Sequence, residues 1–349
     1  MTAETLRSAE DLISARLIEP GERESIDRVA GRYAVAITRD MAELVDRADP
    51  GDPIARQFIP QASELSETPE ERSDPIADQA FSPVKGIVHR YPDRVLLKPL
   101  HACPVYCRFC FRRETVGPRG ERLNPAELDA ALDYIRARPE IWEVILSGGD
   151  PLLLSPRRLG TIVRALDRIP HVAVVRIHSR IPIVDSSRVN AGLLEAMSAE
   201  KALYLVIHAN HPRELGAVQR AACARLVKAG ISLLGQTVLL KGVNDDSAVL
   251  EALFRAMVAT RIKPYYLHQA DLAPGTSHFR TSLDEGQRLM AALRGRVSGL
   301  CQPTYVLDIP GGYGKIPIGP TYAKVRSGSG VWQVQDPAGR IHSYPEAET

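Results

Sequence analysis

Three cysteines stand within eight residues of one another, in the segment His101-Ala-Cys103-Pro-Val-Tyr-Cys107-Arg-Phe-Cys110. Three thiolates this close, with no fourth cysteine nearby, can bind three irons of a [4Fe–4S] cluster and leave the fourth iron open to a ligand from outside the protein. The alternative is a structural zinc ion with His101 as its fourth ligand. Zinc sites usually take paired cysteines or histidines from two places in the chain, so the spacing favours the cluster.

A lysine ends a glycine-rich loop near the C-terminus, Pro310-Gly-Gly-Tyr-Gly-Lys315. A flexible loop is where a lysine amine could bond to pyridoxal phosphate and later release it. A surface lysine after glycines is the more ordinary interpretation of these residues taken alone. Arg90, Tyr91 and Arg94 offer donors suited to a phosphate ester, and exposed side chains on a connecting segment are the alternative.

Two aspartates, Asp271 and Asp308, follow apolar runs that predict strands. Two carboxylates that converge in the mouth of a barrel repel each other unless a cation lies between them, so such a pair would select a cationic substrate. Ordinary helix caps or loop aspartates are the alternative, and Asp271 alone favours that interpretation.

The elements that must position these residues begin at Val95, from where short apolar runs alternate with amphipathic stretches about six times. This order predicts a parallel sheet, in which ligands bind beyond the C-terminal ends of the strands. The expected fold is α/β, a partial (β/α)6-type barrel. The predicted strands are Val95–Leu97, Glu143–Leu146, Val172–Ile177, Ala202–Ile207, Ser232–Leu239 and Lys263–Leu267. The predicted helices are Pro125–Arg136 with Asn124 as its cap, Pro156–Asp167, Asn190–Met197, Pro212–Ala229, Ser247–Thr260 and Leu283–Ser298.

The first 85 residues differ in pattern from the rest. Thr5–Leu17 and Ile26–Val45 have helical periodicity, whereas Gln61–Ala80 is polar and has none, which predicts an α-helical N-terminal region with a loose arm. We therefore expect three parts, over residues 1–85, 86–300 and 301–349, the last of which carries Lys315 and ends in a short polar tail, Arg326–Thr349.

The composition is that of an ordinary folded protein, with 349 residues, 44% hydrophobic, 25% charged and a net charge of +2. Disorder, collagen and coiled coil are excluded, and so small a net charge makes nucleic acid a poor partner. No apolar run approaches the ~18–20 residues that a membrane span needs, and the start of the chain has no secretory leader, so we expect a soluble cytoplasmic protein. Five cysteines in that setting argue against a disulfide framework.

The cysteine loop after the first strand of a repeated β/α unit resembles the radical S-adenosylmethionine superfamily. The resemblance implies that Cys103, Cys107 and Cys110 bind the cluster and that S-adenosylmethionine chelates its open iron. Gly148-Gly149-Asp150, at the end of the second predicted strand, resembles the superfamily's Gly-Gly-Glu-like turn, whose backbone binds the cofactor's amino group. By itself, a glycine pair after a strand indicates only a tight turn.

From about Pro83 to Pro317 the chain resembles one branch of that superfamily, the lysine 2,3-aminomutases. The matching stretches are His89-Arg-Tyr-Pro-Asp-Arg94, Cys107-Arg-Phe-Cys-Phe-Arg-Arg113, Arg176-Ile-His-Ser-Arg180, His208-Ala-Asn-His-Pro212, Gly235-Gln-Thr-Val-Leu-Leu-Lys-Gly-Val-Asn-Asp245, Pro264-Tyr-Tyr266 through Asp271 to His278-Phe-Arg-Thr281, and Asp308-Ile-Pro-Gly-Gly-Tyr-Gly-Lys315.

The resemblance implies a role for each candidate residue. Lys315 anchors pyridoxal phosphate, and three residues before the first barrel strand hold its phosphate. Other side chains hold the substrate's α-carboxylate, clamp its ε-ammonium group, or surround S-adenosylmethionine. The ordinary alternative for the histidine in that last group is a core residue whose hydrogen bonds are satisfied within the protein. These sets are Arg90, Tyr91 and Arg94 for the phosphate, Arg112 for the carboxylate, Asp271 and Asp308 for the ammonium, His208 and Gln236 for S-adenosylmethionine, and His178, Arg180 and Asn210 in the same mouth without an assigned role.

The implied reaction is radical 1,2-amino migration, which converts L-α-lysine to β-lysine. It uses a [4Fe–4S] cluster, S-adenosyl-L-methionine and pyridoxal 5′-phosphate, with an electron donor such as flavodoxin or ferredoxin. One alternative is the short-tailed branch that makes (R)-β-lysine for elongation factor P, and glutamate or arginine aminomutase are others. From a different class, a non-catalytic Fe–S or zinc scaffold would not consume S-adenosylmethionine.

Two departures from the family pattern affect these expectations. Tyr313 stands where the commonest pattern has glycine, which would strain the loop if that position needs a positive φ. The clustered zinc-binding cysteines of the clostridial-type C-terminal extension are missing, and Asp246 replaces one cysteine of the pattern. We therefore expect no structural zinc, and the sequence leaves open whether the chain forms a homo-oligomer.

Overall fold

The computed structural model describes residues 5–117, 120–325 and 331–345, and its centre is a nine-stranded sheet. The strands lie in sequence order across the sheet, and every neighbouring pair from β2 to β8 is parallel. β1 and β9 add antiparallel partners at the two edges. The bounds are β1 Ile87–Tyr91, β2 Arg94–Leu100, β3 Glu143–Gly148, β4 Val174–Ser179, β5 Ala202–His208, β6 Ser232–Val238, β7 Ile262–His268, β8 Thr304–Ile309 and β9 Gly314–Pro317.

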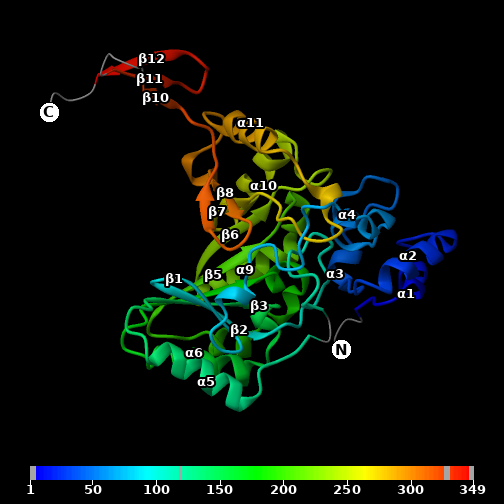
Figure 1. Ribbon diagram of the computed structural model, residues 1–349. Helices are drawn as coiled ribbons and strands as arrows, with labels where there is room; N and C mark the ends of the chain where they lie inside the picture. Colours follow the sequence, from blue (N-terminus) through cyan, green and yellow to red (C-terminus); the bar gives the residue numbers. More distant parts are fainter. Residues whose placement is uncertain (1–4, 118–119, 326–330, 346–349) are drawn as a thin grey trace.

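Helices alternate with the parallel strands, so the predicted partial (β/α)6-type barrel is confirmed (Figure 1). Asn124 caps the first of these helices as predicted, because its side chain accepts a hydrogen bond from the Glu127 amide at 2.9 Å. The fourth helix begins later than predicted, since Pro212–Glu214 forms a separate 3-10 turn. The main helices are α5 Pro125–Arg136, α6 Pro156–Asp167, α8 Ala191–Ala196, α9 Ala217–Lys228, α10 Ser247–Ala259 and α11 Leu283–Leu293, with a short α7 at Ile181–Val184.

The main core lies between the sheet and these helices. Val144 of β3 and Val175 of β4 are fully buried, together with Leu132 of α5 and Ile162 of α6. Burial of one such side chain contributes about 1.5–3 kcal/mol relative to its exposure. The core therefore holds the strand ends, and the side chains that follow them, in fixed positions.

The N-terminal region is less helical than predicted. It contains α1 (Ala9–Ser14), α2 (Arg23–Ala30), α3 (Arg39–Ala42) and α4 (Pro53–Phe58). The predicted single helix over 26–45 is wrong in its middle, because Gly31 ends α2 and the buried Ile37 instead exchanges backbone hydrogen bonds with Leu6 at 2.9 and 3.0 Å.

The segment predicted to be a loose arm is held against the barrel. It forms the 3-10 turns Ala62–Leu65 and Gln79–Phe81. Glu64 is fully buried and accepts hydrogen bonds from Arg108 and Arg113, and Asp78 is only 5% exposed. The expectation of a loose arm is therefore wrong, because buried carboxylates of the arm bind arginines of the cysteine loop.

The C-terminal part forms a small separate sheet rather than a simple polar tail. β10 (Ala323–Val325), β11 (Val331–Gln335) and β12 (Ile341–Pro345) are antiparallel, and they lie away from the barrel mouth (Figure 1). Residues 326–330 and 346–349 of the predicted tail lie outside the described residues. Across the described part of the chain, no helix has both the length and the apolar character to cross a membrane.

Candidate active site

A cavity of about 550 Å³ opens at the C-terminal ends of the parallel strands. This is the place that the alternation of strands and helices predicts for ligands. Of the residues with a predicted role, Gly148 alone is not part of the cavity wall. The others line it: Arg90, Tyr91, Arg94, Cys103, Cys107, Cys110, Arg112, Gly149, Asp150, His208, Gln236, Asp271, Asp308 and Lys315.

The glycine pair after β3 brings that strand against the cysteine loop. The Gly149 amide donates to the Leu100 carbonyl at 2.8 Å, and the Asp150 amide donates to the Ala102 carbonyl at 2.9 Å. A Cβ on Gly149 would lie 2.2 Å from the Ala102 oxygen, and Gly148 has a φ of +101°. Glycine is therefore required at both positions, since other residues would clash or be strained.

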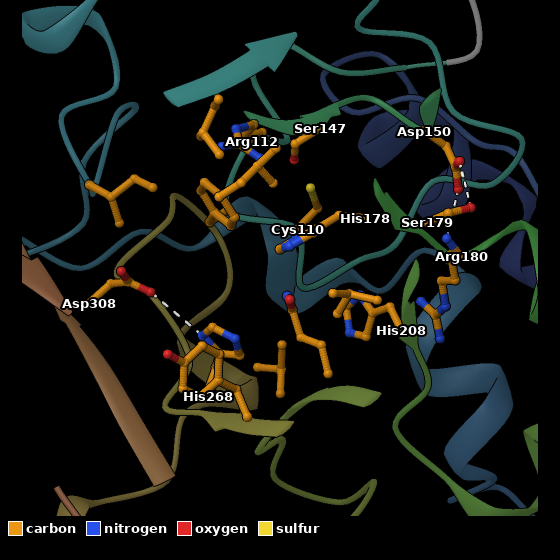
Figure 2. A pocket seen from close by; sticks show the side chains of 18 of the residues that line it. Cys110, Arg112, Ser147, Asp150, His178, Ser179, Arg180, His208, His268 and Asp308 are labelled. Carbon is orange, nitrogen blue, oxygen red and sulfur yellow. Dashed lines mark hydrogen bonds and ion pairs between the residues drawn. The ribbon is translucent and has the colours of Figure 1, made fainter. Parts of the chain in front are cut away.

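The side chain of Asp150 is committed to the protein interior. Its carboxylate accepts hydrogen bonds from the Ser179 hydroxyl at 2.7 Å and from the backbone amides of Arg180 and Ile181 at 2.7 and 3.2 Å (Figure 2). These bonds join the end of β3 to the end of β4. Asp150 therefore shapes the turn, and its carboxylate is occupied by partners within the protein.

The three thiols face the same cavity and influence one another. Burial, then the nearby Asp150 and the other two thiols, raise the pKa of Cys103, and burial raises the pKa of Cys110 to about 11. Cys107 Sγ accepts a hydrogen bond from Arg180 Nη1 at 2.9 Å. Within residues 5–117, 120–325 and 331–345, no three Cys, His, Asp or Glu side chains are grouped tightly enough for a single metal ion. A four-iron cluster instead takes each thiolate on a different iron.

Arg112 forms a buried ion pair with Asp78 of the arm. Arg112 Nε and Nη2 donate to Asp78 Oδ2 at 3.0 and 2.9 Å. The same carboxylate has Arg90 Nη2 at 3.4 Å and Lys98 Nζ at 3.5 Å. Burial alone would raise the pKa of Asp78, but Arg112 and Lys98 outweigh it and hold the pKa below its ordinary value. One carboxylate thus holds three cations, of which Arg90 and Arg112 line the cavity.

The acidic pair lies at another part of the wall. Asp308 is the second-last residue of β8, rather than following the strand, and it accepts a hydrogen bond from Lys315 Nζ. Asp271 lies in the loop after β7. Burial, followed by the negative charge of Asp308, raises the pKa of Asp271 to about 7. Burial would also raise the pKa of Asp308, but His268 and Lys315 outweigh it and lower that pKa. The negative charge of Asp308 therefore acts on Asp271 within the same cavity.

The loop that carries Lys315 has the geometry that its glycines allow. Gly311, Gly312 and Gly314 have φ values of +88°, +83° and +99°. Tyr313 has no positive φ and its side chain is 82% exposed, so the departure from glycine causes no strain there. The Lys315 amide donates to the Tyr91 hydroxyl at 2.8 Å, which joins the loop to the predicted phosphate-binding segment.

Profiles of two protein families match the chain. The Radical SAM superfamily matches residues 97–253, and the family described as Lysine-2,3-aminomutase matches residues 290–349. The L-lysine 2,3-aminomutase of Acetoanaerobium sticklandii is 40% identical over 317 residues, which are 91% of this chain and 77% of that protein. This chain belongs to the lysine 2,3-aminomutase family.

Two further relatives are named for different amino-acid substrates, and one solved structure is a more distant match. The L-lysine 2,3-aminomutase of Clostridium subterminale is 42% identical over 86% of this chain and 72% of its own. The glutamate 2,3-aminomutase of Clostridioides difficile is 36% identical over 86% of this chain and 71% of its own. A radical SAM methyltransferase structure from Sphaerobacter thermophilus is 20% identical and covers 63% of this chain and 68% of that one, with a TM-score of 0.44.

Sequence reasoning missed several residues of this aminomutase-family cavity. His268, the last residue of β7, lies beside the Asp308–Lys315 pair, and its place at a strand end was the available signal. Asp78 had no signal, since it lies in a segment without periodicity. Asn210, expected in the mouth, is instead fully buried behind it, where its side chain contacts Gln57 at 3.0 Å. His178 and Arg180 do line the cavity.

Proposed function

We propose that the chain is an L-lysine 2,3-aminomutase, which moves the α-amino group of L-lysine to the neighbouring carbon and so makes β-lysine. The observation that carries the proposal is one cavity that contains three cysteine thiols, the Lys315 amine and the carboxylates of Asp271 and Asp308. Cofactor sites are concave and place a few polar groups in this way.

The residues present fit the cofactors that the family implies. Cys103, Cys107 and Cys110 would hold a [4Fe–4S] cluster, and Lys315 would hold pyridoxal phosphate. Arg90 Nε is buried and has no hydrogen-bond partner among the described residues, so a phosphate oxygen would satisfy it. When bound, the cluster with S-adenosylmethionine supplies a carbon radical that removes hydrogen, and pyridoxal phosphate supplies a ring that stabilises the unpaired electron.

The protein's own residues would orient the substrate through its two charged ends. Arg112 is fixed by Asp78 through Nε and Nη2, which leaves Nη1 without a partner among the described residues and available to an α-carboxylate. At the other end, Asp271 and Asp308 would hold the ε-ammonium group. A glutamate side chain would bring a third carboxylate to this pair, so the site favours lysine over glutamate.

The remaining wall excludes water from the reacting atoms. Phe109, Val238, Tyr265 and Tyr266 line the cavity between the charged groups. A dry, fixed site keeps a reactive radical from side reactions and holds the substrate C–H bond in place. An electron donor such as flavodoxin or ferredoxin would reach the cluster from outside.

The test is anaerobic incubation of the reconstituted chain with dithionite, S-adenosylmethionine, pyridoxal phosphate and either lysine or glutamate. Formation of β-lysine, with little reaction of glutamate, supports the proposal. Chiral analysis of the product separates the (R)-β-lysine branch from the other lysine enzymes. A chain that consumes no S-adenosylmethionine under these conditions would instead be a scaffold.

A further inference from the structure

His268 is a cavity residue to which the proposed function assigns no part. It ends β7, and the neighbouring strands β8 and β9 carry Asp308 and Lys315. Its Nδ1 lies 3.2 Å from Lys315 Nζ and 3.5 Å from Asp308 Oδ2, and Figure 2 shows the ring turned toward Asp308. The imidazole and the carboxylate therefore both contact the amine that would anchor pyridoxal phosphate.

The contacts define which nitrogen of His268 can take a proton. A lysine ammonium group only donates hydrogen bonds, so the Nδ1 that faces it acts as an acceptor and the ring proton is assigned to Nε2. Nε2 is buried and has no hydrogen-bond partner among the described residues. The imidazole is thus neutral in this arrangement, with its basic nitrogen against Lys315.

We propose that His268 is the catalytic base and acid of Lys315, a role that rests on the proposed function of this site. Lys315 must lose a proton before its amine can attack an aldehyde, and Asp308 accepts a hydrogen bond from the same Nζ. His268 Nδ1 accepts that proton as the new nitrogen–carbon bond forms at the aldehyde of pyridoxal phosphate. His268 then gives this proton to the former carbonyl oxygen. A second proton passes from the newly bonded nitrogen to the same oxygen through Nδ1, so that the oxygen leaves as water and a nitrogen–carbon double bond remains.

The surroundings of His268 suit this exchange. Burial, followed by the positive charge of Lys315, lowers the pKa of His268, while Asp308 opposes both. Tyr266 packs edge-on at 5.6 Å between ring centres, and His178 of β4 and His208 of β5 are close enough that a proton on His268 would disfavour a proton on either of them. A base whose pKa is below its ordinary value stays neutral, and so able to accept, across the neutral pH range.

The experiment measures how fast Lys315 bonds to pyridoxal phosphate, in the absence of substrate turnover. The full chain, free of pyridoxal phosphate, is mixed with saturating pyridoxal phosphate from pH 6 to pH 9. The Lys315 adduct is followed by absorbance and by borohydride trapping with peptide mapping. General acid–base catalysis typically contributes ~10²–10⁴-fold, so we expect His268→Asn and His268→Gln to slow adduct formation at least tenfold at pH 7. The loss should shrink toward pH 9, where solvent hydroxide removes the proton.

The two variants separate proton transfer from simple contact. Asparagine places an acceptor near the Nδ1 position and glutamine places a polar group near Nε2, but neither takes a proton. Recovery of the wild-type rate by either variant overturns the proposal. His171→Gln, which replaces an imidazole outside the cavity that contacts the Ile135 carbonyl, should keep the wild-type pH profile. If wild type forms no Lys315 adduct, the proposed function itself fails, whereas equal rates in wild type and variants refute His268 alone.

Discussion

Asp271 should make lysine turnover depend on pH near neutrality. Burial, followed by the charge of Asp308, raises the pKa of Asp271 to about 7. A carboxyl group with this pKa is about nine-tenths ionised at pH 8 and about one-tenth ionised at pH 6. Because only the ionised form attracts an ε-ammonium group, we expect kcat/KM for lysine to fall about tenfold between pH 8 and pH 6.

The loss should appear mainly in KM, since the charge of the ε-ammonium group does not change as nitrogen migrates. That group has a pKa of about 10.4 and stays charged over this range. The assay compares wild type with Asp271→Asn, each corrected for cluster content and Lys315 adduct. The variant should have a higher KM at pH 8 that varies little with pH. Asp246→Asn, which alters only the cap of α10, serves as the control. If Asp271→Asn has the same KM and kcat/KM for lysine as wild type at every pH, the reasoning is refuted.

Three further perturbations test other parts of the site. Cys107→Ala should remove the paramagnetic signal of the reduced cluster, and a variant that keeps it and still cleaves S-adenosylmethionine would contradict the assignment. Lys315→Ala should abolish the borohydride-trappable adduct but keep the cluster. Label on another lysine of the variant would contradict the assignment of Lys315. Asp78→Asn should lower the free energy of unfolding by about 3–5 kcal/mol in urea titrations, because three partly buried cations lose the buried carboxylate that they share. Asp129→Asn, at an exposed position of α5, should change stability little, and equal effects of the two would show that Asp78 is not a buried ion-pair partner.

The barrel could be predicted because its signals are local. The run from Glu143 to Leu146 is apolar and strand-like, and Asn124-Pro125 is a helix start that needs only its own neighbours. Ile26–Val45 has an equally local helical pattern, but there tertiary contacts prevail. Backbone pairing of Ile37 with Leu6 and burial of residues 35–37 stabilise an extended segment more than helix propensity stabilises a helix.

The partners of the site residues could not be predicted, because they depend on contacts between distant segments. Asp78 lies 34 positions from Arg112 and Glu64 lies 49 positions from Arg113. Neither acid stands in a motif or follows a strand. A buried arginine requires an acceptor, which predicts that some carboxylate must exist but not where it lies in the chain.

The charges around the cavity are the physical basis of the proposed substrate choice. At the arm, Asp78 faces Arg90, Lys98 and Arg112, so this wall keeps an excess of positive charge. Asp308 of β8 and Asp271 in the loop after β7 face the amine of Lys315, which is the one cation of the loop 310–315. When that amine is bonded to a cofactor, Asp308 loses its ammonium partner and the wall favours another cation. A molecule with a carboxylate at one end and an ammonium group at the other complements both walls, whereas a substrate that lacks either charge leaves buried ions unpaired.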